Sequence, residues 1–300
     1  MCDDITELEN QGFYEKLLTR RDFNLLAGGA AISVAFAGCA PGETLPEDTA
    51  TGEGVIESDV MIDTPDGTAD AYFAHPATGT HAAVLIWPDI VGLRPAFKMM
   101  AKRLARDGYA ALVVNPYYRQ ARAPLVEVGQ TFRDPGVREK IIPYRRAMTE
   151  THNRTDANAF INWLDAQVAV DSGRGIGTTG YCMGGPITFF TADERPDRVR
   201  AGASFHGGGL TKDEPGSPHK LVPDINADYL IAIAANDDKR DPESKTILKE
   251  AFAASDNSAE IEVYAGTQHG WCPPDSAVYN EAAADKAWAR TLVLFEKSLG

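Results

Sequence analysis

The chain is short of cysteine, of basic residues and of metal-binding motifs. Its 300 residues include four cysteines, at positions 2, 39, 182 and 272, which do not make a disulfide framework in a chain of this size. Lysine and arginine number 29 against 43 aspartates and glutamates, for a formal net charge of -14. Nucleic acids and anionic membranes require clustered positive charge, so neither is expected as a partner. No histidine and carboxylate cluster has the spacing of metal ligands, and we expect no metal.

The sequence also lacks a long apolar run and any sign of a second folded domain. Residues 25–38 are only mildly apolar and fall short of the ~20 residues that span a bilayer. Hydrophobic residues make up 44% of the chain, enough for one full core.

The N-terminal segment has features of an export signal. Arg20 and Arg21 lie in a stretch that resembles the twin-arginine pattern, and Ala37-Gly38-Cys39 looks like a lipobox in which Cys39 would be acylated. We therefore expect residues 1–39 to be a signal, residues 40–54 a flexible tether and residues 55–300 the folded domain. On this interpretation the protein is periplasmic or a membrane-anchored lipoprotein.

Two features oppose the export signal. Several acids precede the arginines, and Phe36 is bulkier than the usual lipobox residue. The alternative is an amphipathic N-terminal helix, packed on the domain or on a partner, in a cytoplasmic protein.

Strand and helix patterns alternate through the remaining chain. Residues 84–87 and 110–114 are apolar runs typical of buried strands, and apolar residues at helical spacing separate them over positions 95–108. A hairpin is expected over residues 55–75, and a further helix over residues 156–168. This rhythm predicts an α/β fold built on a parallel sheet.

The segment Gly180-Tyr181-Cys182-Met183-Gly184 has the form of a nucleophile elbow, in which a strand turns sharply into a helix. The cramped turn requires residues without bulk two positions before and after the nucleophile. The positive end of the following helix favours a thiolate, and its first amides can point at the oxygen of an attacked carbonyl. The structural alternative is a buried cysteine that acts as a small hydrophobic residue.

An acid and a histidine follow this turn in the chain order that such an elbow predicts. Asp237 comes just after one apolar strand and His269 just after the next. We predict a triad in which His269 takes the proton of Cys182 and Asp237 fixes the tautomer of the ring. Asp238 and Asp241 are alternatives for the acid, or cap the helix that begins near residue 242.

Two further side chains lie close in sequence to these groups. His206 follows another predicted strand and is expected to form a wall of the site or a hydrogen bond. Cys272 is expected to be a buried small side chain, although in an oxidising compartment it could form a reversible disulfide with Cys182.

These motifs, together with the segments at residues 87–94 and 115–120, resemble the dienelactone hydrolases, a family of the α/β-hydrolase fold. The resemblance extends from about Val55 to the C-terminus. The resemblance implies a mostly parallel central sheet with helices on both faces. It also implies a carboxymethylenebutenolidase-like hydrolase of a small-molecule ester or lactone, which needs no cofactor and forms a covalent intermediate on Cys182. The oligomeric state stays open.

The resemblance also suggests roles in a segment that follows an early strand. The family carries a glutamate where Asp89 stands, and that glutamate pairs with the resting thiol and swings to deprotonate it when substrate arrives. Asp89 is the implied thiol partner, although it is one methylene shorter. The amides of Ile90 and Met183 are the implied oxyanion hole.

Substrate binding is implied in part by a block at residues 115–120. It is similar to the block that supplies an arginine for the substrate carboxylate, which gives that role to Arg119, with Tyr117 and Trp271 as further substrate contacts. Where the family's lactonases carry a second arginine, this chain has Pro273. One arginine is half of a two-point clamp and would select a charged lactone less sharply.

The segment at residues 115–148 is rich in arginine and long for a bare connection, so we expect a wall or lid over the site. Its arginines either present a positive face to an anionic substrate or pair with surface acids.

Two other functions remain as alternatives. The first is a catalytically silent binding protein on the same fold. The second is a nucleotide-binding oxidoreductase, because residues 175–180 match G-x-G-x-x-G literally. That fingerprint needs a strand before its glycines, whereas here the strand occupies them, so we expect no dinucleotide.

Overall fold

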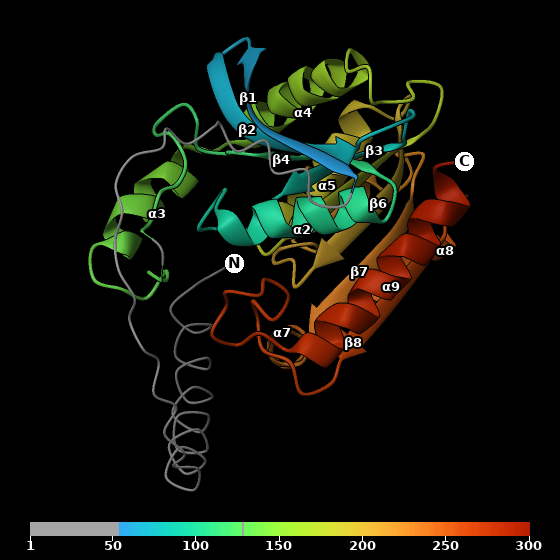
Figure 1. Ribbon diagram of the computed structural model, residues 1–300. Coiled ribbons are helices and arrows are strands. Elements are labelled where there is room, and N and C mark those ends of the chain that lie inside the picture. The colour runs from blue at the N-terminus through green and yellow to red at the C-terminus, as the bar shows by residue number, and fades with distance from the viewer. Residues whose placement is uncertain (1–53, 128) are drawn as a thin grey trace, which may run out of the picture.

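An eight-stranded sheet runs through residues 54–127 and 129–300, the parts of the chain that the computed structural model describes (Figure 1). The strand order is β1-β2-β4-β3-β5-β6-β7-β8. Strand β2 is antiparallel to both β1 and β4, and all other neighbouring strands are parallel. The predicted signal at residues 1–39, with Cys39, lies outside the described residues.

The elements follow one another in the alternation that the sequence predicts. The strands are β1 (Val55–Thr64), β2 (Gly67–Pro76), β3 (Ala83–Trp87), β4 (Ala110–Val114), β5 (Ile176–Tyr181), β6 (Val199–Phe205), β7 (Asp228–Ala234) and β8 (Ala259–Tyr264). The helices of the described residues are α2 (Pro95–Arg106), α3 (Val137–Ala147), α4 (Glu150–Asp165), α5 (Gly184–Glu194), α6 (Pro218–Leu221), α7 (Ala235–Arg240), α8 (Ser244–Ala253) and α9 (Glu281–Ser298).

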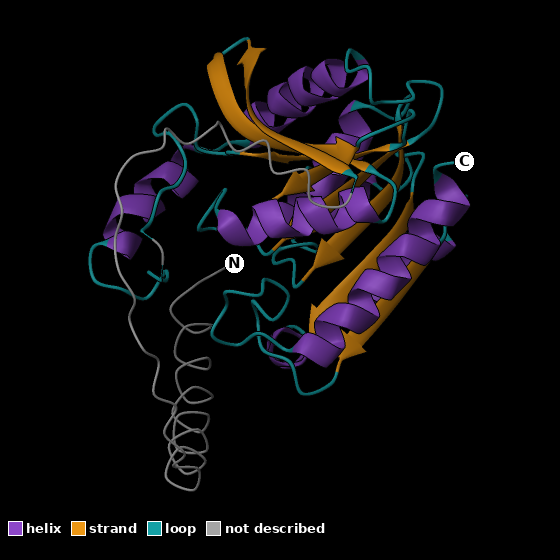
Figure 2. Ribbon diagram, viewed as in Figure 1, coloured by secondary structure: helices purple, strands orange, loops and turns teal. Residues whose placement is uncertain are grey.

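Helices cover both faces of the sheet (Figure 2). Leu85 and Trp87 of β3 belong to a core cluster that also holds side chains of α4, α5 and α8. Val84 and Ile86, which point the other way, belong to a second cluster with side chains of α2 and α9. Since a strand buried on both faces has no polar side, β3 reads as a continuous apolar run. The predicted α/β fold with a mostly parallel sheet is confirmed.

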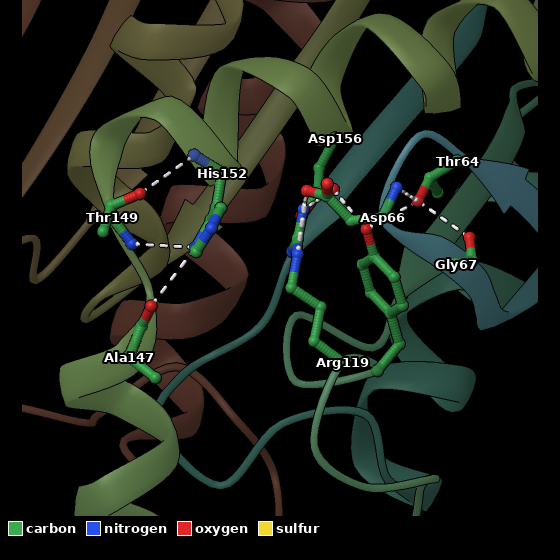
Figure 3. Close-up of polar contacts among 9 residues, drawn as sticks. Thr64, Asp66, Gly67, Arg119, Ala147, Thr149, His152 and Asp156 are labelled. Atoms are coloured by element: carbon green, nitrogen blue, oxygen red, sulfur yellow. Dashed lines mark hydrogen bonds and ion pairs between the residues drawn. The ribbon is translucent and has the colours of Figure 1, made fainter.

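The helix predicted over residues 156–168 begins earlier than expected, at Glu150. A capping box explains this start (Figure 3). The Thr149 hydroxyl accepts from the amide of His152 at 3.1 Å, and the His152 ring accepts from the amide of Thr149 at 3.4 Å. Because each side chain satisfies an amide of the other, the first turn closes without the usual Glu or Gln at the third position.

Strand β5 contains glycine where the sheet face that packs against α9 leaves no room for a side chain. A side-chain carbon at Gly177 would lie 2.8 Å from the ring of Phe295 in α9. Gly177 and Gly180 of the G-x-G-x-x-G match therefore lie within a buried strand, and Gly175 directly precedes it. The sequence predicts that the strand occupies these glycines, and it does so for the last two of the three.

Neither a membrane-spanning helix nor a metal-binding group is found in the described part of the chain. No helix there is long and apolar enough to cross a bilayer. Within the same residues no group of three or more histidine, cysteine or carboxylate side chains could hold a metal ion.

Candidate active site

The connection between β5 and α5 is the sharp turn that the sequence predicts. Cys182 has a φ of 53°, in the left-handed region, which costs roughly 1–3 kcal/mol for a residue other than glycine. Two backbone hydrogen bonds hold this conformation. The Cys182 amide donates to the Phe205 carbonyl at 3.0 Å, and the Gly185 amide donates to the Cys182 carbonyl at 3.1 Å. The thiol is thereby fixed at the carboxyl edge of the sheet.

The glycines on either side of the turn are required by close backbone contacts. A side-chain carbon at Gly180 would lie 2.0 Å from the Gly184 carbonyl oxygen, and one at Gly184 would lie 2.3 Å from the Trp87 carbonyl oxygen. Both distances are below any real carbon contact, so α5 packs against β3 and β5 only because these positions have no side chain.

The predicted acid and histidine lie beside the thiol. Nδ1 of His269 is 2.7 Å from Oδ2 of Asp237, and the amide of His269 donates to Oδ1 of Asn236 at 2.8 Å. The imidazole also hydrogen-bonds the thiol of Cys182. These groups follow β5, β7 and β8, whose carboxyl ends meet at one edge because the strands are parallel.

The alternative acids have other partners. Asp238 is paired with Lys245 at 2.6 Å. Asp241 contributes backbone atoms, because its amide donates to the Asp237 carbonyl and its carbonyl accepts from the Ser244 amide. Its side chain does not cap α8, whose first turn has no side-chain cap. Among the three acids, Asp237 is the one that contacts His269.

The electrostatics of this group favour a charged imidazole. Burial alone lowers the pKa of His269, but the charges of Asp237 and Cys182 and their hydrogen bonds outweigh it and raise the pKa above its ordinary value. A raised pKa means that the ring keeps a proton at neutral pH more readily than a free histidine does. That favours a proton on the ring.

A cavity of about 580 Å³ opens over Cys182. Ile90 and Met183 line it together with the thiol. Among the described residues, no hydrogen-bond partner is found for the amide of either one. Two free amides beside a thiol are the arrangement that an oxyanion hole requires.

Tyr117 lies beneath these two residues and not in the cavity. It is fully buried, its hydroxyl donates to the Ile90 carbonyl at 2.9 Å, and it lies 3.1 Å from the Met183 sulfur. The expected substrate contact of Tyr117 is therefore not seen in the structure. The Tyr117 ring instead packs behind Ile90 and Met183.

Arg119 is also placed differently from the expectation (Figure 3). Its guanidinium donates to both carboxylate oxygens of Asp156 at 2.8 Å and to Asp66 at 2.5 and 3.1 Å. Asp156 is 2% exposed. Arg119 does not line the cavity over Cys182, because its guanidinium joins α4 to the turn between β1 and β2.

Trp271 and Cys272 pack into the second core cluster, whereas Cys182 belongs to the first. Trp271 is fully buried and stacks on Tyr264 at 4.8 Å between ring centres, so it does not line the cavity. Cys272 is a free thiol that lines a separate cavity of about 190 Å³, and burial raises its pKa. This arrangement opposes a disulfide between the two cysteines.

His206 forms a wall behind the imidazole of His269. Its ring centre lies 5.1 Å from that of His269, and both of its nitrogens are buried without a hydrogen-bond partner among the described residues. Burial, with the nearby His269, holds its pKa well below the ordinary value, so the ring stays neutral.

The residues that sequence reasoning missed are Arg94 and Asp275. Arg94 is 7% exposed, and its guanidinium donates to both oxygens of Asp89 at 2.7 and 2.9 Å. It also donates to both oxygens of Asp275 at 2.6 and 3.0 Å. A buried arginine needs acidic partners, which could have pointed to these residues. The sequence does not show that Arg94 is buried, however, because its burial depends on tertiary packing.

Comparisons with known proteins concern the family and the fold of the chain. A family model for the dienelactone hydrolase family matches residues 69–299. The carboxymethylenebutenolidase of Rhodococcus opacus is 26% identical over 246 residues, which cover 78% of this chain and 88% of that protein.

Two solved structures share the fold. The dienelactone hydrolase of Anabaena variabilis superposes with a TM-score of 0.59 at 16% identity, over 83% of this chain and all of that one. A dienelactone hydrolase-like promiscuous phosphotriesterase from metagenomic libraries has a TM-score of 0.65 at 23% identity, over 81% of this chain and 99% of that one. At such identities the likeness concerns the fold alone.

Proposed function

Since the chain belongs to the dienelactone hydrolase family, we propose that it hydrolyses its substrate through a covalent thioester on Cys182. The family and its carboxymethylenebutenolidase relative make the chain a hydrolase of carboxylic esters or lactones. The observation that carries the proposed chemistry is the contact series from Asp237 to His269 to Cys182. Of these three residues Cys182 lines the cavity, and the other two lie behind it.

In the first half of the reaction His269 takes the thiol proton, and the sulfur attacks the carbonyl carbon. The carbonyl oxygen becomes an oxyanion, for which the free amides of Ile90 and Met183 are the donors. Collapse of this intermediate expels an alcohol or enol, to which His269 returns the proton, and leaves a thioester on Cys182.

In the second half His269 takes a proton from water, whose oxygen attacks the thioester. The products are the free carboxylic acid and the thiol, which recovers its proton from the imidazole. Asp237 accepts the hydrogen bond from Nδ1 of the ring and stabilises the charged ring.

We further propose that the substrate carries an anionic group. The cavity over Cys182 has more basic than acidic side chains, in a chain whose net charge is -14. The basic residues are Arg138, Arg145, Arg146 and Lys212, and the acidic ones are Glu150 and Glu214. Glu150 is itself paired with Arg154.

Helix α3 supplies the three arginines. Among the described residues, no ion pair involves Arg145 or Arg146, so their charges are available to a ligand. A cavity with a surplus of one charge raises the local concentration of oppositely charged substrates. The positive charge that resemblance assigned to Arg119 is therefore assigned here to α3.

The chemistry is tested with a panel of aryl esters and lactones. Cys182→Ala is expected to abolish hydrolysis, and rapid quenching of the wild type is expected to reveal an acyl adduct on Cys182 by peptide mass spectrometry. Cys272→Ala is the matched control and should behave as the wild type. Hydrolysis that persists in Cys182→Ala would contradict the mechanism, and a protein that binds these compounds without turnover would be a silent receptor.

The substrate charge is tested with paired esters that differ only in a carboxylate. Replacing Arg145 and Arg146 together by glutamine should raise KM about tenfold for the anionic ester, equivalent to about 1.4 kcal/mol, and leave the neutral ester unchanged. Arg122→Gln is the control, because Arg122 is exposed and lies outside the cavity. Equal effects on both esters would remove the charge argument.

We also propose that the protein is exported by the twin-arginine route, with Cys39 as a lipid anchor. The support is the sequence of residues 20–39. Arg20→Lys with Arg21→Lys should leave the protein in the cytoplasm, and Cys39→Ala should release it from the membrane fraction. Cytoplasmic location of the unaltered chain would contradict this proposal.

A further inference from the structure

Arg94 is the most fully bonded side chain near the site. Its five N–H groups all donate, to Asp89 and Asp275 as described and to the Gly92 carbonyl at 3.2 Å. The guanidinium therefore has no donor left for a substrate. Its role therefore depends on Asp89 and Asp275, the two carboxylates that it joins.

Those groups belong to the two segments that carry the reacting atoms. Asp89 directly precedes Ile90, which lines the cavity and whose amide has no hydrogen-bond partner among the described residues. Asp275 lies in the loop that follows His269. Since both links are bidentate and involve a buried arginine, they restrict rotation as well as distance. Arg94 thus fixes the segment that carries Ile90 relative to the loop that follows His269.

The same contacts decide what Asp89 can do. Oδ1 and Oδ2 both accept from Arg94, and Oδ1 also accepts from the Val91 amide at 2.9 Å. Burial raises the pKa of this carboxyl and Arg94 opposes the rise, while the charge on Cys182 adds to it. Asp89 is therefore close enough to the thiol to interact with it, yet its hydrogen bonds go elsewhere.

From this geometry we propose that Arg94 is a positioning residue that holds Asp89 off the thiol, so that Cys182 rests paired with His269 before any substrate binds. The inference depends on the proposed function of Cys182. The thiol proton passes to the imidazole nitrogen that faces the sulfur, while Asp237 holds the other nitrogen. No swing of a carboxylate is needed to generate the nucleophile.

Other charged groups also face the thiol and influence the pH at which it ionises. On the sheet side the ionisable groups are His269, backed by Asp237, and Asp89, backed by Arg94. Across the cavity the charged side chains are Arg138, Arg145, Arg146, Lys212, Glu150 and Glu214. The first free amides of α5 add a positive helix end behind the sulfur.

The test is the pH dependence of alkylation by iodoacetamide in the substrate-free enzyme, in a Cys272→Ala background. The resting thiol should react at pH 6 at more than a tenth of its rate at pH 8. Arg94→Met releases Asp89 beside the sulfur and should lower the rate at pH 6 at least tenfold and reduce kcat more than it raises KM. In Arg94→Met with Asp89→Leu the alkylation profile should return toward that of the parent.

Arg103→Met is the control for loss of an arginine from α2, since Arg103 pairs with Asp285 at the surface. If Arg94→Met does not fold, the double variant and the parent still decide the matter. A parent thiol that is inert at pH 6 and becomes reactive only on addition of an ester substrate would overturn the inference. That result, with Cys182→Ala inactive, would leave the proposed function standing. Activity in Cys182→Ala would remove both.

Discussion

Replacing Arg119 by methionine separates two roles for that residue. The resemblance to the family assigns it to the substrate, whereas the structure pairs it with Asp156 and Asp66 (Figure 3). Methionine keeps most of the apolar stem and lacks the guanidinium, whose central carbon lies 4.6 Å from the centre of the Tyr118 ring. The substitution therefore removes the charge, the hydrogen bonds and this cation–π contact.

The expected cost follows from the exposure of the two partners. Asp156 is 2% exposed and loses its cation, and breaking a buried pair from one side costs about 3–5 kcal/mol. Asp66 is 40% exposed, so its pair adds less than about 1 kcal/mol. Because the carboxyl can take up a proton, we expect the low end, about 3 kcal/mol, which lowers Tm by about 6–12 °C in a chain of this size.

The loss should depend on pH in a definite direction. Burial already raises the pKa of Asp156 in spite of Arg119, and without the arginine it rises further above the unfolded value. A protonated Asp156 then stabilises the folded state at low pH, and this contribution disappears as the pH rises through the folded pKa. The variant should therefore be closer to the wild type at pH 5 than at pH 8.

Urea unfolding at both pH values measures the cost, and KM for paired anionic and neutral esters measures the substrate role. Arg122→Met is the matched control, because its pair with Asp70 is 3.3 Å long and Arg122 is 56% exposed. Arg119→Met with Asp156→Asn should recover part of the lost stability. The reasoning is refuted if Arg119→Met keeps its stability and instead raises KM tenfold for the anionic ester alone.

Three other substitutions test the site. Asp237→Asn should lower kcat by about 10²–10⁴-fold and move the alkaline limb of its pH profile to lower pH, because Asp237 is the main group that raises the pKa of His269. Gly180→Ala should lower the free energy of unfolding by about 3 kcal/mol or more, since the new carbon meets the Gly184 carbonyl. Cys272→Ala should leave hydrolysis and its response to mild oxidation unchanged, measured by residual activity after peroxide treatment.

The outcomes that contradict these three are equally specific. An unshifted alkaline limb in Asp237→Asn would mean that another group titrates. Gly266→Ala is the control for the second substitution, because it adds a carbon in open space at a φ of 75° and should cost only ~1 kcal/mol. If the Cys272→Ala variant resisted peroxide better than the wild type, that result would support an inhibitory disulfide between Cys182 and Cys272 in the wild type.

The order of the reactive groups could be predicted because it is a property of the chain. Buried strands appear as short apolar runs, and the residues that follow them must meet at one sheet edge when the strands are parallel. That local information places Cys182 and His269 and leaves three acids as candidates, among which the tertiary contacts favour Asp237. The need for glycine at position 180 is equally local, because the close contact is with Gly184, whereas the need at position 184 comes from Trp87 of β3.

Substrate recognition could not be predicted in the same way, because the partner of a long charged side chain is chosen by packing. Arg119, Tyr117 and Trp271 stand at expected positions in the sequence, yet the structure gives the first an ion pair and buries the other two.

By itself the sequence determined the α/β class, the sharp turn at Cys182 and the chain order of the candidate site residues, since these follow from periodicity and from glycine geometry. Only the tertiary structure decided that Arg94 takes both carboxylates of Asp89 and Asp275 and that α3 carries the positive wall of the cavity. These contacts join residues far apart in the chain, and such pairings are set by burial and charge in three dimensions and not by spacing.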